Sequence, residues 1–229
     1  MASPTTRCLA GVTVPDTPLI TKALSYVKEQ CDVLVYNHVV RSWLFGAYIA
    51  SHTPAFTTYD TELHAIATIL HDMGWSTNLS LISPDKRFEV DGANTAREFL
   101  KIEGRPEEWN KHRLQLAWDA IALHTTASIA MEKEIEVKIC YCGIGADFVG
   151  PEKAPSCPIP MDIWKGILKE FPRNGFREGV KEAMCGLCKT KPETTYDNIV
   201  ADFGVRFVKG YNIEGKRGID IILAADDWE

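Results

Sequence analysis

Apolar residues recur at intervals of three and four along most of the chain, which is the spacing typical of amphipathic helices. The stretch Leu63–Gly74 shows it most clearly, because Leu63, Ile66 and Leu70 fall on one helix face. We expect that face to point into the core and the terminal glycine to mark the end of the helix. His64 lies one residue off the apolar face, and we expect it to be solvated.

The same spacing predicts helices through most of the remaining sequence. One start is marked at Asp16-Thr17-Pro18, where a capping side chain is followed by a proline in the first turn. The predicted helical stretches are 16–27, 33–50, 63–74, 93–103, 106–124, 134–148, 161–171, 175–189 and 195–208.

Strand patterns are short in this sequence. No alternation of apolar and polar residues extends beyond a few positions, and the dipeptides of tight hairpins are missing. We therefore predict an all-α, single-domain helical bundle. Residues 1–15 are expected to form a surface lead-in, residues 16–208 the helical core, and residues 209–229 a tail that docks on the core.

Composition and charge narrow the classes of partner. The chain has 229 residues, of which 45% are hydrophobic, enough for one large core. The net charge of -6 and the lack of a long basic run argue against nucleic acid. No apolar segment approaches membrane-spanning length, and the first residues lack a signal-peptide core. We expect a cytoplasmic protein that acts on a small molecule, with no membrane or nucleic-acid partner.

The seven cysteines do not form a recognisable metal motif. Cys140 and Cys142 lie within an apolar run and read as core residues. Cys185 and Cys188 form a lone CxxC, without the second pair that a four-thiolate zinc site needs. We interpret them as reduced thiols in or near a helix, with a redox role as the alternative.

A group of histidines and aspartates lies on helix faces that otherwise look buried. These residues are His38, His71, Asp72, His124 and Asp147. A buried carboxylate is costly unless something positive meets it, whereas carboxylate and neutral imidazole together are ordinary ligands of zinc or iron. Because the residues are far apart in sequence, several helices must converge to bring them together, as in metal sites inside helix bundles.

The order of these residues resembles the HD-domain superfamily of metal-dependent hydrolases and lyases. His38, the doublet His71-Asp72 and Asp147 match the metal positions of its single-metal members. The similarity covers roughly residues 16–208. It implies that these four residues bind one metal ion.

Three longer strings resemble the fungal cyanamide hydratases. They are Asn-His-x-x-Arg-Ser at 37–42, Arg-Phe-Glu-Val-Asp-Gly-Ala at 87–93 and Trp-Asp-x-Ile-Ala-Leu-His-Thr at 118–125. Those enzymes bind zinc and add water to cyanamide to give urea. The resemblance implies a zinc-dependent hydro-lyase acting on cyanamide or a similarly small nitrile, with Fe²⁺ as the alternative metal. It also implies a homo-oligomer.

The expected mechanism follows from the metal. A bound metal lowers the pKa of its water from 15.7 to about 7, so that hydroxide can attack the nitrile carbon at neutral pH. We expect His124 to donate the proton that the nitrogen needs, since an ordinary histidine pKa is about 6.5. Asp72 is expected to hold the water and take its proton. Glu89 and Asp91 are expected to orient the ligand imidazoles.

Three other hypotheses remain open from the sequence. The first is an HD-type phosphohydrolase on nucleotides, whose phosphate clamp would come from Arg41, Lys86 and Arg87. The second is a di-iron oxygenase, which needs two more histidines and finds only His112 and His124 between Asp72 and Asp147. The third is a non-catalytic helical domain that binds a partner. For His124 itself, a structural hydrogen bond near the site is open as the alternative to a direct part in catalysis.

Overall fold

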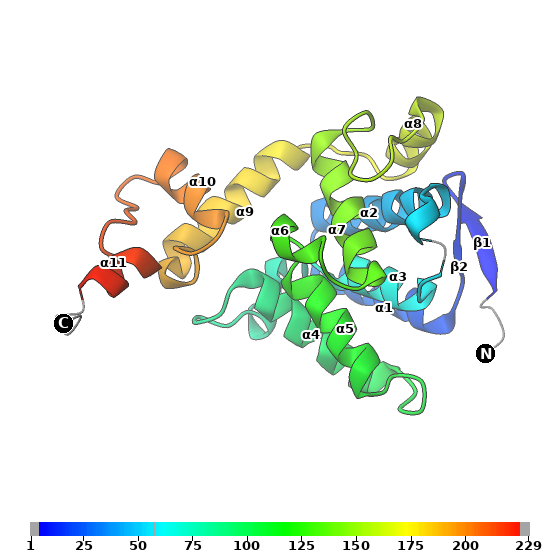
Figure 1. Ribbon diagram of the computed structural model, residues 1–229, viewed down its shortest axis with the longest axis horizontal. Coiled ribbons are helices and arrows are strands. Elements are labelled where there is room, and N and C mark those ends of the chain that lie inside the picture. Colours follow the sequence, from blue (N-terminus) through cyan, green and yellow to red (C-terminus); the bar gives the residue numbers. More distant parts are fainter. Residues whose placement is uncertain (1–4, 57, 225–229) are drawn as a thin grey trace. The chain divides into compact units, whose positions relative to one another are not determined.

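The computed structural model describes residues 5–56 and 58–224 (Figure 1). These residues form eleven α-helices, four short 3-10 helices and one two-stranded sheet, so the predicted all-α class is confirmed. Among them, no helix combines the length and apolarity needed to cross a bilayer. The elements in chain order are β1 Thr6–Leu9, β2 Val12–Pro15, α1 Pro18–Gln30, α2 Val33–His52, η1 Pro54–Phe56, α3 Thr61–Leu70, η2 Met73–Trp75, η3 Leu79–Leu81, α4 Phe88–Glu103, α5 Lys111–Ala122, α6 Ala127–Ala130, α7 Ile135–Val149, α8 Met161–Glu170, α9 Phe176–Thr190, η4 Pro192–Thr194, α10 Val200–Phe207 and α11 Gly218–Leu223.

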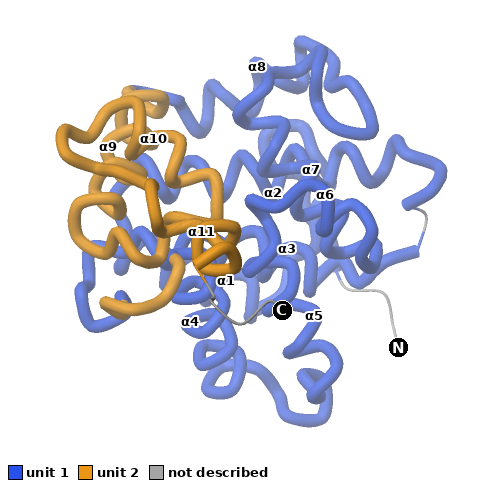
Figure 2. Tube along the Cα trace, turned by 60° about the vertical axis from the view of Figure 1, so that its left-hand side comes forward, with its two compact units in different colours: residues 1–82, 88–174 blue, residues 83–87, 175–229 orange. Residues whose placement is uncertain are grey.

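The chain divides into two compact units, which Figure 2 shows in different colours. The first lies within residues 1–82 and 88–174, and the second within residues 83–87 and 175–229. The boundary at 174/175 falls inside the stretch 16–208 that the sequence placed in one core. Helical periodicity continues on both sides of that boundary, so the pattern alone does not reveal it.

Helix α3 occupies the centre of the first unit. Every residue from Leu63 to Leu70 is buried, because α1, α2, α5 and α7 all pack against this helix. The predicted apolar face is therefore inside, but the opposite face is inside as well. His64 is 1% exposed, so the expectation that it is solvated was wrong.

Helices α2 and α7 make the most extensive helix–helix contact of this unit, and glycines allow it. A Cβ built on Gly143 would lie 2.3 Å from the carbonyl oxygen of Ser42 and 2.8 Å from Cα of Gly46. No larger residue fits at Gly143 without a shift of one backbone. This close crossing brings His38 of α2 beside Asp147 of α7.

Strands β1 and β2 form a hairpin that the sequence analysis did not predict. They pair antiparallel through the turn Ala10-Gly11, where φ is 47° and 82°. Val12 and Val14 are 4% and 1% exposed, and β2 packs against α2 and α3. Residues 6–15 therefore contribute to the core rather than forming a surface lead-in. Strands of four residues are too short to show an alternating pattern, and alanine is unusual at the first position of such a turn.

Helix α5 is shorter than the predicted stretch 106–124. It begins at Lys111, because the Asn110 side chain accepts hydrogen bonds from the N–H groups of His112 and Arg113 at 3.0 and 3.1 Å. It ends at Ala122, so that His124 lies beyond the helix. The predicted helical stretch 195–208 is likewise longer than the observed helix α10, which begins only at Val200.

The second unit is built around α9 and α10. Cys185 and Cys188 of α9 are both buried and carry free thiols, as expected for reduced cysteines on a helix. In the tail, the Tyr211 hydroxyl lies 2.6 Å from Thr195 Oγ1 within the same unit. Docking of the tail on the predicted core stays a prediction, and residues 225–229 lie outside the described part.

Candidate metal centre

His71 and Asp72 follow α3 where its geometry changes. His71 keeps helical dihedral angles, but Asp72 has φ -99° and ψ 22°, and the chain continues into η2. The bend lets two adjacent side chains reach one point, with His71 Nε2 3.2 Å from Asp72 Oδ2. Gly74 is needed for packing here, since a Cβ on it would lie 2.0 Å from the carbonyl oxygen of Phe88.

His38 of α2 completes a buried cluster with this pair. Its Nε2 lies 3.3 Å from His71 Nε2 and 3.5 Å from Asp72 Oδ2. One ligand atom from each of the three residues lies within 4.8 Å of the others, and all three residues are buried. The structure thus brings together three of the four residues that the sequence assigned to the metal.

Hydrogen bonds donated by Nδ1 orient each imidazole of the site. The Nδ1 atoms of His71 and His124 lie 2.7 and 2.6 Å from main-chain carbonyl oxygens three residues earlier. Nδ1 of His38 lies 2.7 Å from Oδ2 of Asp147. Carbonyl and carboxylate oxygens only accept, so Nδ1 carries the proton and Nε2 of each neutral ring presents its lone pair.

Asp72 shows why a cation fits at this point. Its Oδ2 is buried and has no hydrogen-bond partner in the protein. An ionised oxygen without a donor and two converging nitrogen lone pairs are costly unless a cation binds all three. These donor types are those that zinc and iron take in proteins.

His124 lies next to the three-residue cluster. Its Nε2 is 3.7 Å from Oδ1 of Asp72, and its ring meets that of His71 edge-on at 4.8 Å. Burial, with His71 as a further cause, lowers the pKa of His124 to about 4. The neutral ring therefore faces Asp72 with the nitrogen that accepts a proton.

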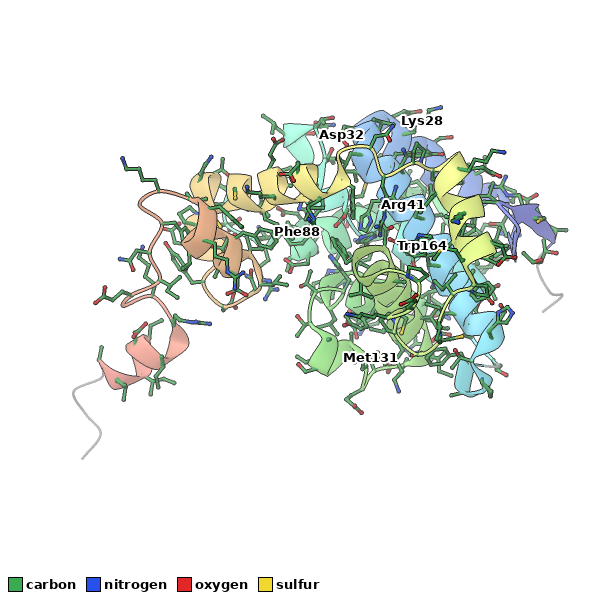
Figure 3. All side chains as sticks on the ribbon, turned by 90° about the horizontal axis from the view of Figure 1, so that it is seen from above. Lys28, Asp32, Arg41, Phe88, Met131 and Trp164 are labelled. Carbon is green, nitrogen blue, oxygen red and sulfur yellow. The ribbon has the colours of Figure 1, made fainter. Side chains whose placement is uncertain are left out.

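The structure places Asp147 against the other nitrogen of His38. Oδ2 accepts from His38 Nδ1 and from Arg41 Nη2, both at 2.7 Å. Oδ1 accepts from Arg41 Nε at 2.9 Å and from Arg173 Nη2 at 2.9 Å. Burial alone would raise the pKa of Asp147, but the hydrogen bonds from His38 and Arg41 hold it well below its usual range. Arg41, labelled in Figure 3, is itself 1% exposed.

Two buried carboxylates lie on the first turn of α4. Glu89 and Asp91 are 0% and 4% exposed, and Thr125 Oγ1 donates to Glu89 Oε1 at 2.6 Å. This hydrogen bond links α4 to the residue that follows His124. The predicted role of both carboxylates in orienting ligand imidazoles stays a prediction.

Aromatic rings surround the polar cluster. Phe88, labelled in Figure 3, stacks on Trp75 at 5.3 Å and meets His124 edge-on at 5.6 Å. Phe148 meets His38 edge-on at 5.3 Å. Apolar walls strengthen electrostatic interactions at the cluster, because they keep water from screening it.

The histidines needed for a second metal do not come together in the described structure. His112 is exposed in the first turn of α5, whereas His124 lies beyond the other end of that helix. A helix of this length spans roughly 18 Å. The di-iron hypothesis therefore loses one of its required ligands.

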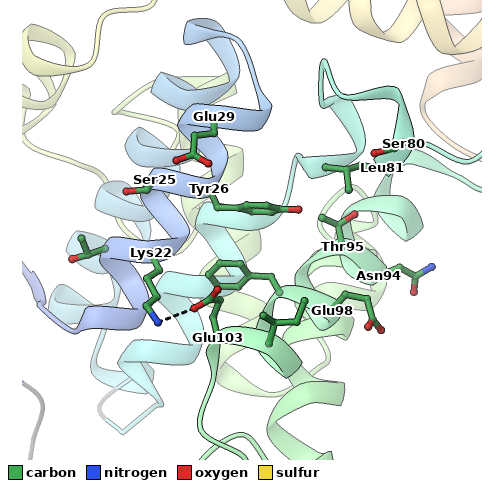
Figure 4. A pocket seen from close by; sticks show the side chains of 13 residues that line it. Lys22, Ser25, Tyr26, Glu29, Ser80, Leu81, Asn94, Thr95, Glu98 and Glu103 are labelled. Carbon is green, nitrogen blue, oxygen red and sulfur yellow. Dashed lines mark hydrogen bonds and ion pairs between the residues drawn. The ribbon is translucent and has the colours of Figure 1, made fainter.

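A separate hollow lies on the first unit. This groove of about 680 Å³ runs between α1, η3 and α4 (Figure 4). Tyr26 and Phe99 contribute aromatic rings to it, and Lys22 bonds to Glu103 at its edge. No residue of the metal centre lines it, so the groove does not bear on the chemistry described above.

Comparison with known families agrees with this geometry. Residues 35–142 match the family model of the HD domain. Over these residues the chain is similar to the HD domain. The match includes His38, His71, Asp72 and His124 and ends five residues before Asp147. HD-domain proteins are all-helical and are typically metal-dependent hydrolases. No curated protein matches the chain.

Proposed function

We propose that this HD-domain protein is a metal-dependent enzyme that adds water to a small nitrile, with cyanamide as substrate and urea as product. The metal site is supported by one observation above all. Asp72 Oδ2 is buried without a donor, while His38 Nε2 and His71 Nε2 direct lone pairs toward it. The choice of cyanamide rests on the strings at 37–42, 87–93 and 118–125.

The residues of the site suit the addition of water. A divalent cation held by His38, His71 and Asp72 would supply Lewis acidity and acidify its water. His124 would accept the proton of the adding water at Nε2 and pass it to the nitrile nitrogen, while oxygen bonds to carbon and one π bond of the nitrile breaks. This refines the expectation of His124 as a simple donor, since its Nδ1 proton is engaged by a carbonyl oxygen.

The closed form of the site favours a small substrate. His38, His71, Asp72 and His124 are each at most 5% exposed. Arg41 was expected to clamp a phosphate. Its guanidinium instead donates hydrogen bonds to Asp147 and to the carbonyl oxygens of residues 171 and 172. A nucleotide would need both a wider opening and cations directed at its phosphate.

Nucleotide phosphohydrolysis is the second candidate function, because members of the HD family are typically hydrolases. Its remaining clamp residues are Lys86 and Arg87, which belong to the second unit. Within that unit Lys86 Nζ lies 2.9 Å from Asp85 Oδ1, and Arg87 Nη1 lies 3.9 Å from Asp197 Oδ1. We therefore place it after the hydratase.

A direct assay separates the two candidates. Purified protein is incubated with cyanamide, with product urea measured, and in parallel with nucleoside monophosphates, with released phosphate measured. We expect urea and little phosphate, and we expect His71→Ala to lose turnover. His112→Ala, which changes an exposed histidine, is the matched control and should retain it. Phosphate release without urea production would reject the hydratase in favour of the phosphohydrolase.

Metal identity and assembly are part of the proposal. We propose zinc as the resident ion, with Fe²⁺ as the alternative, because imidazole and carboxylate ligands suit both. We also propose that the protein self-associates in the cytoplasm, as the related hydratases do. Mass spectrometry of the metal and size-exclusion chromatography with light scattering test these two points.

A further inference from the structure

The Asp147 carboxylate is saturated with hydrogen-bond donors. Five N–H groups approach it within 3.1 Å: one from His38, two from Arg41 and two from Arg173. A carboxylate offers about four lone-pair sites. No lone pair of Asp147 is therefore left over for a metal ion unless an N–H group is displaced.

Asp72 provides the contrast within the same site. Its Oδ2 has no donor, and its Oδ1 is 3.7 Å from the nearest imidazole nitrogen of His124. Both carboxylates are almost completely buried, at 2% and 0% exposure for Asp72 and Asp147. They differ in what they contact: Asp72 keeps its lone pairs available, and Asp147 does not.

The donors hold Asp147 from two sides. Arg41 lies one turn after His38 on α2, so one helix presents both groups to the carboxylate. Arg173 approaches from the segment after α8, where its guanidinium also lies over the ring of Trp164 at 5.0 Å. An ionised, fixed carboxylate in turn fixes the Nδ1 proton of His38 and aims Nε2 of that ring at Asp72.

We propose that Asp147 is a positioning residue, which acts through His38 and is not itself a metal ligand. The inference rests on the proposed metal site and assigns its ligands as His38, His71 and Asp72. Arg41 and Arg173 keep Asp147 ionised and oriented. The sequence-based assignment of Asp147 as the fourth ligand would require the metal to compete with the arginines for its lone pairs.

Cobalt is a suitable probe, because Co²⁺ reports both ligand number and ligand protons. Co²⁺ is titrated into metal-free wild-type protein and Asp147→Asn, followed by visible absorption and by proton NMR in water. We expect the variant to bind one Co²⁺ at saturation with an unchanged absorption band, and with an affinity about 10- to 100-fold lower. The exchangeable Nδ1 proton signal of His38 should shift or exchange faster, while that of His71 stays.

A change in the absorption band of Asp147→Asn that indicates a lost ligand would overturn the inference. If wild-type protein binds no Co²⁺, the proposed function fails first, and the two failures are thereby distinguished. Circular dichroism checks that the variant folds, since Asp147→Asn leaves the buried Arg41 without its anion.

Arg173→Gln is the milder second variant, because Arg173 is 32% exposed and its loss leaves Arg41 in place. If Asp147 only positions His38, removing Arg173 lowers Co²⁺ affinity by up to tenfold or leaves it unchanged. If Asp147 binds the metal, removing the competing guanidinium raises the affinity. A rise in Co²⁺ affinity for Arg173→Gln therefore contradicts the inference even when Asp147→Asn does not fold.

Discussion

The two oxygens of the Asp72 carboxylate have different surroundings, and this difference governs the chemistry at the scale of single residues. Oδ1 faces the lone pair of His124, whereas Oδ2 faces those of His38 and His71 and receives no hydrogen bond. A bound cation would satisfy all of these atoms together. Folding and metal binding should therefore be coupled.

Metal removal should destabilise the protein. At a free ion concentration one hundred times the dissociation constant, a ligand that binds only the folded state adds about 2.7 kcal/mol to the free energy of unfolding. We expect the melting temperature to fall on treatment with a chelator and to recover when zinc is restored. An unchanged melting temperature would mean that no cation binds at Asp72.

His124 should affect turnover without affecting metal content. Proton transfer by a positioned side chain contributes typically about 10²- to 10⁴-fold to rate. We expect His124→Ala to lower kcat for cyanamide by that range and to retain its metal, measured by mass spectrometry. The exposed His112→Ala is the control. Wild-type kcat in His124→Ala would leave this histidine with a structural role only.

At the scale of secondary-structure elements, the site depends on how α3 begins and on how α2 crosses α7. Asp60 caps α3 by accepting from Leu63 N–H at 2.9 Å, and it also accepts from Arg113 of α5 at 2.7 and 3.0 Å. Arg113 in turn lies over the ring of Trp109 at 4.0 Å. The helix that presents His71 is thus fixed at its opposite end.

Replacing Asp60 tests the cap separately from the ion pair. Asp60→Asn keeps a capping oxygen and loses the charge, whereas Asp60→Ala loses both. We expect the alanine variant to be about 1 kcal/mol less stable than the asparagine variant, measured by urea unfolding. Equal stabilities would show that the cap contributes nothing to α3.

Gly143 should tolerate no side chain. Alanine normally stabilises a helix by about 1 kcal/mol relative to glycine, but here its Cβ would overlap the backbone of α2. We expect Gly143→Ala to lower the free energy of unfolding by about 1–3 kcal/mol. Gly186→Ala on α9 is the control, because a Cβ built on Gly186 meets no neighbouring group within 4 Å, and it should be stabilising. A stabilised Gly143→Ala would contradict the close crossing.

The elements show which features a sequence can reveal. Apolar spacing predicted α1 and α3, and the start of α1 could be placed because Thr17 and Pro18 act locally on the helix that they begin. The hairpin was missed because Val12 and Val14 are buried by distant helices, which no pattern over four residues records. His64 was misjudged for the same reason.

The candidate site was predicted in part. His38, His71 and Asp72 could be named from their order along the chain, and the structure brings them together. The contacts of Asp147 could not be predicted, because Arg173 reaches it from 26 residues away and Arg41 from 106. Whether a carboxylate binds a metal or a guanidinium depends on which side chains the fold places around it.

At the scale of the whole molecule, buried neutral imidazoles couple stability to pH. Burial lowers the pKa of His64 to about 3, and its Nε2 has no hydrogen-bond partner. The unfolded chain takes up a proton at this residue near pH 6.5, which the folded protein resists down to about pH 3. Its contribution to stability is therefore complete above pH 6.5 and is lost as the pH falls toward 3.

A variant isolates this effect. When the pH falls from 6.5 to 4.5, the unfolded chain binds a proton at His64 and the folded protein does not. This difference should lower the free energy of unfolding of wild-type protein by about 2–3 kcal/mol, since each pH unit is worth about 1.4 kcal/mol per proton. The His64→Leu variant has no titrating group at this position, whereas every other titrating group is common to both proteins. We expect urea unfolding to show a smaller acid loss in the variant. Parallel losses would mean that His64 is not buried as a neutral ring.

The central claim is that His38, His71 and Asp72 hold one divalent cation, and metal analysis tests it most directly. Inductively coupled plasma mass spectrometry of purified wild-type protein should find about one zinc or iron per chain. Folded His71→Ala, checked by circular dichroism, should contain almost none, and His112→Ala should match wild type. A metal-free wild-type protein that stays metal-free after exposure to zinc and Fe²⁺, or a His71→Ala variant with a full complement, would contradict the claim.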